Sequence, residues 1–582
     1  MYKKISRLAI LSFLSLCLLL TCVSCSMSSG KKEQKKFDEF MNNLFLEEVQ
    51  SDTLSLNYSL AYPENYGITN TNVKFGDYSM DSMREDLVKS ENELDYLSSF
   101  KYNNLTSNQQ LTYNIVKNSL IQNLQFGNYP YYSECLGPTT GIQAQLPILL
   151  AEYSFYDKKD IEEYLELLPC IKNYFKSIIH YEQEKSRRGL FMNDSVANRI
   201  IDQCKAFINK PESNFLIQYF NERISNYKGL TKNEITRYEA LNTEAVLCYV
   251  IPAYEDLINS LTKLLGTGKN NAGLYYYPEG RAFYECLAKY KTGSGKSMKE
   301  MIQMLDNAIE GGVNDITALA ESDPNLIDKY LSFSSFPITD PNEILTDLKQ
   351  DIKKDFPDST PVSCEIKYVP ESLADFLSPA MYLVPPIDSY RNNNIYINGH
   401  SKQTLSMIYT TVAHEGYPGH LYQCVYFRSH NPAPIRNILS FTGYDEGWAT
   451  YVEYYSYHLA GIDENLADFL ETNNRVTLCM YARADIGIHY EGWTKAETAN
   501  YISKYIGDKD IANSIYNTLL EEPAIYLPYA IGYLEIMELK NEAEKDLGDK
   551  FVTKDFHKFL LDIGPAQFNI IEDNMKEWEK NY

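Results

Sequence analysis

The stretch AHEGYPGH, residues 413–420, combines a His-Glu pair with a second histidine. A catalytic zinc ion takes about three protein ligands, commonly two imidazoles and one carboxylate, and keeps a position for water. A further carboxylate beside that water can act as the base. His414, His420 and Glu446 supply the first set, and Glu415 supplies the second. These residue types predict metal-assisted hydrolysis.

The spacing of the two histidines does not suit an uninterrupted helix. Residues six apart lie about 120° from each other around a helix, whereas residues four apart lie within about 40°. Between His414 and His420 stand Gly416, Pro418 and Gly419. Proline removes a helical donor, and glycine accepts unusual dihedral angles. We expect a bulge here that absorbs the two additional residues and turns His420 back towards His414.

Helical spacing of apolar residues recurs along most of the chain. Between residues 160 and 188 it continues on both sides of Pro169, which predicts a kink or a junction between two helices. Residues 361–399 differ, because β-branched and aromatic runs alternate there with proline and asparagine, which predicts a few short strands. The sequence therefore predicts a mainly α fold with a small β-sheet next to the active-site helix, and an exposed sheet edge could pair with an extended peptide. The helical spacing also appears in residues 83–100, 246–265, 298–309 and 511–520.

Composition bounds the class of protein. The chain has 582 residues, more than one ordinary compact domain, so two lobes or one large enzyme unit are expected. Hydrophobic residues make up 44% and charged residues 23%, which is typical of a globular protein. The formal net charge of −24 disfavours a nucleic-acid partner, because binding to phosphates would begin with repulsion.

The first residues have the layout of an export signal. Lys3, Lys4 and Arg7 precede an apolar run over residues 8–20. This run is too short to be a comfortable membrane-spanning helix. A polar, lysine-rich stretch follows it. We therefore expect the protein to be exported.

The end of the signal is similar to that of bacterial lipoproteins. It reads CVSC, in which Ser24 is the small residue before Cys25. The resemblance implies that Cys25 becomes the lipidated first residue, anchored at the outer face of a bacterial membrane. Lipidation at Cys22 and simple cleavage are the alternatives. The predicted organisation is a signal peptide (1–24), a polar tether (25–36) and a helical catalytic domain (37–582).

Two motifs carry a resemblance to a known family. HEGYPGHLYQ, residues 414–423, resembles the HExxPGHxxQ signature of the bacterial family called domain of unknown function 885, whose members look like zinc metallopeptidases. The second signature of that family, EGWAxYxE, is similar to EGWATYVE at residues 446–453. The resemblance extends from about residue 37 to the end through GRAFY (280–284), DIGIHYEGWTKAE (485–497), PYAIGYLEIMEL (528–539) and FHKFLLDIG (556–564).

The resemblance implies roles for the motif residues. DEGWA, residues 445–449, is similar to the second element of the glutamate zincins, in which the glutamate binds zinc. Carried over, Glu446 is the third ligand beside His414 and His420, and Glu415 is the base. The implied protein is a mostly helical, clefted peptidase with one Zn²⁺ ion and peptide substrates.

The chain departs from the family pattern at two positions. The family commonly has a second histidine directly after PGH, where this chain has Leu421, so His420 is the candidate for the second imidazole. The frequent arginine after the tyrosine motif is replaced by Lys540. If Lys540 binds a substrate carboxylate, the charge is kept but the bidentate grip of arginine is lost.

Further residues could assist the reaction. An oxyanion needs a donor facing the metal, and Tyr529 is the first candidate and His489 the second. Glu453 lies seven residues after Glu446, on the same helical face, and could orient a ligand histidine. Packing is the more frequent role of such a tyrosine and the alternative for either oxyanion candidate, and a solvated helix face explains Glu453 as well as an orienting role does. TGSGKS, residues 292–297, lacks the first glycine of a phosphate-binding loop, and no GxSxG motif is present.

The sequence thus favours a membrane-anchored zinc metallopeptidase. An exported lipoprotein that binds peptides without cleaving them is the alternative, as is a closed, four-coordinate structural metal site. The intact His-Glu pair favours the enzyme, because a binding protein needs no base beside a ligand. Cleavage at a terminus and internal cleavage both fit the sequence, and so do a monomer and an oligomer.

Overall fold

The computed structural model describes residues 30–69, 71–369, 378–399, 405–506 and 509–582. The predicted signal peptide and Cys25 lie outside the described residues. Residues 30–36 of the predicted tether are already helical and continue into a helix that extends to residue 49. Within the described part of the chain, no helix combines the length and apolar character needed to span a membrane.

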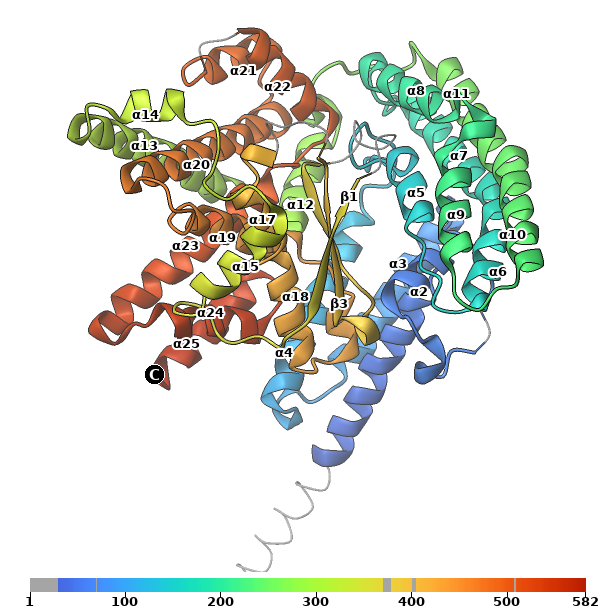
Figure 1. Cartoon of the computed structure of the whole chain (residues 1–582), viewed down its shortest axis with the longest axis horizontal. Coiled ribbons are helices and arrows are strands. Elements are labelled where there is room, and N and C mark those ends of the chain that lie inside the picture. Colours follow the sequence, from blue (N-terminus) through green and yellow to red (C-terminus); the bar gives the residue numbers. More distant parts are fainter. Residues whose placement is uncertain (1–29, 70, 370–377, 400–404, 507–508) are drawn as a thin grey trace, which may run out of the picture.

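A curved layer of helices forms one side of the molecule, at the right of Figure 1. The predicted junction at Pro169 is confirmed, because a short 3₁₀ turn, Leu168–Cys170, separates two helices there. The layer has its own hydrophobic core. It consists of α5 (Ile142–Ala151), α6 (Lys158–Leu167), α7 (Ile171–Arg188), α8 (Asp194–Ile208), α9 (Phe215–Asn226), α10 (Lys232–Ala245) and α11 (Ile251–Leu264).

The opposite side and the centre are built from the C-terminal half of the chain (Figure 1). These helices surround the sheet and carry both family motifs. They are α12 (Gly280–Thr292), α13 (Met298–Ser322), α14 (Leu326–Ser332), α15 (Pro341–Asp351), α17 (Tyr409–Glu415), α18 (His420–Ser429), α19 (Thr442–Ser456), α20 (Glu464–Ile486), α21 (Lys495–Ile502), α22 (Lys509–Glu521), α23 (Leu527–Leu547), α24 (Thr553–Ile563) and α25 (Phe568–Lys580).

The remaining helices come from the start of the chain and are drawn in shades of blue in Figure 1. They are the helix of residues 30–49, α2 (Thr53–Ser59), α3 (Met80–Ser98) and α4 (Ser107–Phe126). The helix α4 begins with a capping box, in which the side chains of Thr106 and Gln109 bond reciprocally to each other's backbone N–H.

The predicted short strands form a three-stranded sheet in the order β1-β3-β2. They are β1 (Ser363–Tyr368), β2 (Ala380–Leu383) and β3 (Asn392–Ile397). The strand β3 pairs with β1 in parallel and with β2 antiparallel, so β2 forms one edge. The prediction of a mainly α fold with a small sheet beside the motif helix is confirmed, because α17 packs against β2.

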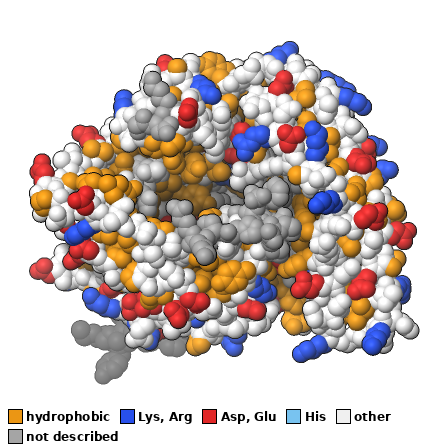
Figure 2. Space-filling model, turned by 45° about the horizontal axis from the view of Figure 1, so that its top comes forward, with side chains coloured by type: hydrophobic (Ala, Val, Ile, Leu, Met, Phe, Trp, Pro, Cys, Tyr) orange, Lys and Arg blue, Asp and Glu red, His pale blue; other side chains and the backbone are white. Residues whose placement is uncertain are grey.

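The core beneath the sheet and the motif helices contains large aromatic side chains. Tyr409, Tyr444 and Trp448 are each at most 1% exposed and belong to one hydrophobic cluster with strand residues such as Ile395. This core fixes the directions in which α17, α18 and α19 meet. The surface is not uniformly convex, and Figure 2 shows a recess lined by hydrophobic side chains.

Candidate metal centre

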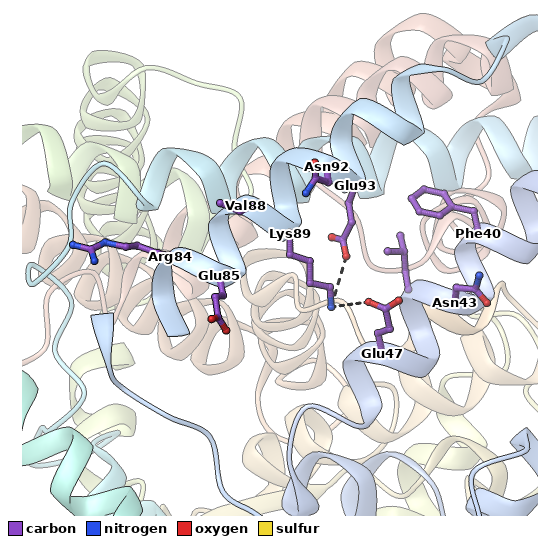
Figure 3. A pocket seen from close by; sticks show the side chains of 10 residues that line it. Phe40, Asn43, Glu47, Arg84, Glu85, Val88, Lys89, Asn92 and Glu93 are labelled. Carbon is purple, nitrogen blue, oxygen red and sulfur yellow. Dashed lines mark ion pairs between the residues drawn. The ribbon is translucent and has the colours of Figure 1, made fainter. Parts of the chain in front are cut away.

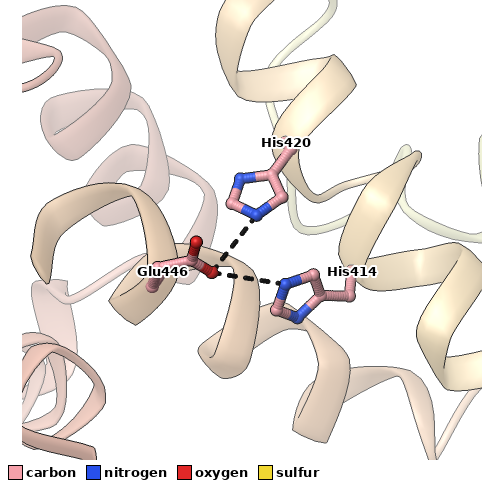
Figure 4. A group of neighbouring side chains, drawn as sticks. All are labelled: His414, His420 and Glu446. Atoms are coloured by element: carbon pink, nitrogen blue, oxygen red, sulfur yellow. Dashed lines mark ion pairs between the residues drawn. The ribbon is translucent and has the colours of Figure 1, made fainter. Parts of the chain in front are cut away.

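His414, His420 and Glu446 meet at one point, where α17, α18 and α19 approach each other (Figure 4). The Glu446 Oε2 atom lies 3.5 Å from His414 Nε2 and 3.4 Å from His420 Nε2. One ligand atom from each residue lies within 4.8 Å of the other two. We call these three residues the inner cluster. The structure therefore brings together the three groups that the sequence predicts as ligands.

The six-residue spacing is accommodated differently from the expected bulge. The helix α17 ends at Glu415, and Gly416 adopts a non-helical conformation with φ −109° and ψ −100°. A new helix, α18, begins at His420 itself. The backbone is thus interrupted and restarted rather than bulged, because the core fixes α18 in a new direction. His420 can face His414 since the two belong to different helices.

The turn between the two helices is held by close backbone contacts. The N–H of Gly419 donates to the Ala413 carbonyl at 3.0 Å. A Cβ atom on Gly419 would lie 1.7 Å from the His414 carbonyl oxygen, so no other residue fits there without a shift. Trp448, on α19, donates its indole N–H to the Pro418 carbonyl at 2.9 Å. The turn is therefore fixed to the helix that carries Glu446.

The inner cluster is removed from water and oriented by a further carboxylate. The side chains of His414, His420 and Glu446 are 12%, 19% and 20% exposed. The Nδ1 atom of His414 lies 2.9 Å from Glu453 Oε2, as expected for a carboxylate that fixes the ring and its tautomer. Glu453 therefore occupies the orienting position that its spacing from Glu446 predicts.

The charges of the inner cluster depend on each other. Burial opposes a charge on His414, but its contacts with Glu446 and Glu453 outweigh that effect and raise the pKa of His414. The pKa of His420 is raised by Glu446 against the same opposition from burial. Burial alone would raise the pKa of Glu446, yet the neighbouring histidines hold it well below its usual range. Glu446 is therefore a carboxylate at neutral pH.

The geometry of the inner cluster fits a divalent metal ion. Zinc binds nitrogen and carboxylate oxygen at about 2.0–2.2 Å, so neighbouring tetrahedral ligands are about 3.3–3.6 Å apart. The separations of 3.4 and 3.5 Å match that value. They are longer than a charge-assisted hydrogen bond, which is about 2.7–2.9 Å. The buried Oε2 atom of Glu446 also lacks a hydrogen-bond partner, which a cation at this point would supply.

Glu415 lies beside the inner cluster but is not part of it. Its Oε2 atom accepts a hydrogen bond of 2.8 Å from the backbone N–H of Tyr382 on the edge strand β2. Glu415, Tyr382 and all three inner-cluster residues line one cavity of about 530 Å³, which we call the first cavity. A carboxylate in this position can exchange a proton with a molecule held at the cluster.

Tyr529 is also at the site. Its ring is stacked against that of His414, with a centroid distance of 6.4 Å. Burial, followed by the negative charges of Glu446 and Glu415, raises the pKa of Tyr529, so the hydroxyl keeps its proton and can donate a hydrogen bond. It reaches this place because α19 and α23 touch closely. A Cβ atom on Gly447 would lie 2.4 Å from the Gly532 carbonyl carbon.

His489 does not lie at the inner cluster. It is 1% exposed, its Nδ1 atom accepts from Leu274 N–H at 3.0 Å, and its Nε2 atom is 2.9 Å from the Leu519 carbonyl. Burial lowers the pKa of His489 to about 4, so the ring is neutral. Both ring nitrogens are therefore engaged by the backbone, and the second oxyanion candidate has a structural environment.

Neither Lys540 nor Leu421 presents its side chain to the first cavity. Lys540 is eleven residues after Tyr529 on α23, which is about 16 Å along a helix, and its Nζ atom lies 3.5 Å from Glu544. It does not line the first cavity. Leu421 is fully buried in the core. The structure thus leaves Lys540 without access to a substrate in that cavity.

Sequence and structure comparisons place the chain in a family. The family model described as a bacterial protein of unknown function (DUF885) matches residues 63–575. The chain belongs to the DUF885 family. No curated protein matches this DUF885 chain in sequence.

Two solved structures share the fold of this DUF885 protein. A candidate lipoprotein from Colwellia psychrerythraea is 18% identical with a TM-score of 0.83, over 94% of this chain and 100% of that chain. A candidate lipoprotein of unknown function from Shewanella oneidensis is 16% identical with a TM-score of 0.63, over 92% of this chain and 99% of that chain. Trypanosoma cruzi metallocarboxypeptidase 1 is 11% identical with a TM-score of 0.33, over 94% of this chain and 93% of that chain, which is too low to support an argument.

Sequence reasoning missed several residues of the DUF885 site. Arg428 and Arg436 line the first cavity together with the inner cluster. Arg436 follows the second histidine by sixteen residues, in the 3₁₀ turn Pro434–Asn437, and no spacing rule connects the two. Tyr382 contributes through its backbone, which leaves no mark in a sequence. The two prolines before Arg436 were the available signal, because they indicate a loop near the motifs.

Two other cavities differ in their relation to the inner cluster. A second cavity, of about 670 Å³, shares Glu446 and Tyr529 with the first and extends from the cluster in another direction. A cavity of about 570 Å³ between the helix of residues 30–49 and α3 has no histidine or cysteine in its lining (Figure 3). There Lys89 is paired with Glu47 at 2.9 Å and with Glu93 at 3.7 Å. Of these three cavities, the first two adjoin the inner cluster.

Proposed function

We propose that this protein is a zinc-dependent hydrolase that cleaves peptide bonds. The observation that carries the proposal is the inner cluster, in which two imidazoles and one carboxylate are spaced as ligands of one cation. Glu415 adds a carboxylate that lines the same cavity without joining the cluster. A structural metal site would be closed by a fourth protein ligand, whereas this one opens into a cavity.

The residues around the cluster have separate tasks. A zinc ion held by the inner cluster would polarise the substrate carbonyl and make a coordinated water more acidic. Glu415 takes the proton of the attacking water and passes it to the leaving amine as the C–N bond breaks. Tyr529 donates a hydrogen bond to the oxygen that becomes negative. Glu453 keeps the His414 ring in the orientation that presents Nε2 to the ion.

The neighbouring strand supports peptides as the substrate class. Residues of β2 line the first cavity, and this strand is at the edge of the sheet. An extended peptide could pair its backbone with this edge and present one carbonyl to the cluster. The N–H of Tyr382 already bonds to Glu415, which links the edge strand to the base.

The test is metal analysis combined with a mixed-peptide digest. We expect one zinc ion per chain in the wild type and in Glu415→Gln, and cleavage that is about 10²–10⁴-fold slower in the variant. Glu365→Gln, on the exposed face of β1, is the matched control and should cleave normally. Equal cleavage by wild type and Glu415→Gln would refute the assigned base. Absence of zinc from both would refute the metal centre.

We also propose that the protein is exported and lipid-anchored at Cys25. The basic and apolar start of the sequence supports this, and both solved relatives are described as candidate lipoproteins. Growth with an alkyne-labelled fatty acid should label the wild type and Cys22→Ser but not Cys25→Ser. Labelling of Cys25→Ser and not of Cys22→Ser would move the anchor to Cys22.

A further inference from the structure

Arg436 is an unusual component of the first cavity. It is 5% exposed, and its guanidinium forms no ion pair with a carboxylate of any described residue. Its Nη2 atom donates to the carbonyls of Ile563 at 2.7 Å and Pro565 at 3.1 Å. The guanidinium group lies over the Phe427 ring. The buried Nε atom has no partner. Burial lowers the pKa of Arg436 to about 10, which leaves it charged at neutral pH.

A buried charge without a counter-ion is costly for a protein, and it is usually paired. The carbonyl contacts at the end of α24 satisfy only one nitrogen of the guanidinium. The remaining donors are therefore suited to an anion that is not part of the chain. The planar guanidinium matches a carboxylate in shape as well as in charge.

A second arginine lines the same cavity. Arg428, on α18, donates a hydrogen bond to the Pro385 carbonyl, and it too forms no ion pair with the carboxylates that the structure describes. The carboxylates of this cavity, Glu415, Asp445 and Glu446, all belong to the two motif segments around the cluster. The part of the cavity beyond the cluster is therefore positively charged.

The second cavity has the opposite character. Its lining includes Glu134, Glu521 and Glu522, with Lys291 as its one cationic residue among those described. Glu134 is paired with Lys185 and Glu521 with Arg199. Glu522 accepts hydrogen bonds from the backbone of the loop at residues 139–140. The two cavities share Glu446 and Tyr529. A substrate that crosses the cluster therefore meets arginines without a carboxylate partner on one side and carboxylates that already have partners on the other.

We propose that Arg436, assisted by Arg428, binds the C-terminal carboxylate of a peptide substrate, so that the enzyme removes a short C-terminal piece. This inference rests on the proposed peptidase function and names its substrate class. Arg436 and the inner cluster line the same cavity, so a short stretch of peptide separates a carboxylate bound at Arg436 from the bond cleaved at the cluster. An acidic side chain near the cleaved bond offers the same carboxylate chemistry, and the experiment separates the two.

The first test measures binding with zinc-loaded Glu415→Gln protein, so that substrates stay intact. Three acetylated tetrapeptides are compared by calorimetry: a free acid without acidic side chains, its C-terminal amide, and an amide with glutamate as its last residue. We expect the free acid to bind about 10- to 100-fold more tightly than its amide. Tightest binding of the glutamate-containing amide would assign the arginines to an acidic side chain instead. Equal affinities for all three would overturn the proposal.

Variants then assign the effect to the arginines. Arg436→Gln in the Glu415→Gln background should lose the preference for the free acid, and Arg436→Lys should keep part of it. The matched control is Arg483→Gln, because Arg483 is 8% exposed but is already paired with Asp306 and Glu491 outside the cavity. If Arg436→Gln does not fold, Arg428→Gln gives the measurement at a half-buried position, and an unchanged preference there and in Arg436→Lys would count against the subsite.

Cleavage products give an independent measurement in the wild type. Mass spectrometry should find loss of a short C-terminal piece from free-acid peptides and little cleavage of the amides. Preferential binding without any cleavage would retain the carboxylate subsite and refute the proposed peptidase. Equal cleavage of acids and amides would retain the peptidase and refute the subsite.

Discussion

Two groups of histidine and carboxylate side chains have similar composition but differ in their surroundings. One is the inner cluster, and the other consists of His458, Asp468 and Glu471, which we call the outer cluster. In the outer cluster, His458 Nε2 lies 3.2 Å from Glu471 and 3.7 Å from Asp468. Its side chains are 25–42% exposed, whereas those of the inner cluster are 12–20% exposed.

The two clusters differ less in their donor types than in how their imidazole rings are oriented and how far solvent reaches them. In the inner cluster, Glu453 fixes the second nitrogen of His414, and Glu446 keeps a buried oxygen without a partner. In the outer cluster, the imidazole is already bonded to Glu471, and water competes for every donor. Exposed ion pairs contribute about 0–1 kcal/mol. Donor types and short distances alone are therefore weak evidence for a metal site. The stronger evidence is a group such as Glu453, which orients a ligand atom towards the site.

The largest expected effect is loss of the metal. His420→Ala removes one of three ligands and should abolish zinc binding and hydrolysis together. His458→Ala, the matched change in the outer cluster, should leave both unchanged. Zinc per chain is measured by mass spectrometry of the folded protein, with circular dichroism as the check on folding. A loss of zinc in His458→Ala would show that the outer cluster also binds a metal.

Tyr529→Phe should have the next largest effect. It removes the proposed donor to the oxyanion while keeping the ring against His414, so kcat should fall by about 10²–10³-fold. Zinc content should not change. Tyr526→Phe, three residues earlier and also in the second cavity, is the matched control. A fall in kcat of less than threefold in Tyr529→Phe would exclude this role.

Glu453→Gln should have a smaller effect on the metal. The amide keeps the shape of the side chain but loses the charge that orients His414, so zinc affinity should fall by about 10- to 100-fold. Competition with a coloured chelator measures this affinity. Glu471→Gln makes the same change beside His458 and should have no effect. Unchanged zinc affinity in Glu453→Gln would mean that core packing, and not the carboxylate, holds the ring.

The pH dependence sharpens the same comparison. With no metal bound, the pKa values of His414 and His420 are raised, so these rings stay protonated to a higher pH than free histidine. Zinc must displace those protons, and its affinity should fall by about tenfold per pH unit for each proton released as the pH drops below the raised values. The pKa of His458 is also raised, chiefly by its hydrogen bond to Glu471.

NMR titration of the imidazoles measures this difference. The His414 and His420 transitions should disappear when zinc is added, whereas that of His458 should remain. A His458 transition that also disappears would contradict the distinction between the clusters.

The sequence identified the three residues that the structure brings together, because the motifs record side-chain identity. Its expectation of a bulge between His414 and His420 was wrong in form, since contacts far along the chain, such as Trp448 to Pro418, set the direction of α18. The candidate His489 failed for a similar reason. Its two backbone partners, at Leu274 and Leu519, could not be read from its neighbours.

For the fold, too, the sequence predicted local features and missed those that depend on packing. Apolar spacing gave the helices and the junction at Pro169, because those signals are local. A π-helical turn at Val246–Val250, which precedes α11, was not predicted, since it depends on packing against other helices. Arg436 lies in a 3₁₀ turn, Pro434–Asn437, which is too short for a periodicity to indicate which way a side chain points.

The backbone contact between Gly447 and Gly532 has a consequence for how the site can vary. Glu446 and Tyr529 sit beside these glycines on two helices that touch without side chains between them. A single methyl group at either glycine would wedge the helices apart and displace the proposed ligand and the proposed proton donor together. Two residues with no functional group of their own are therefore expected to be as intolerant of replacement as the groups that perform the reaction.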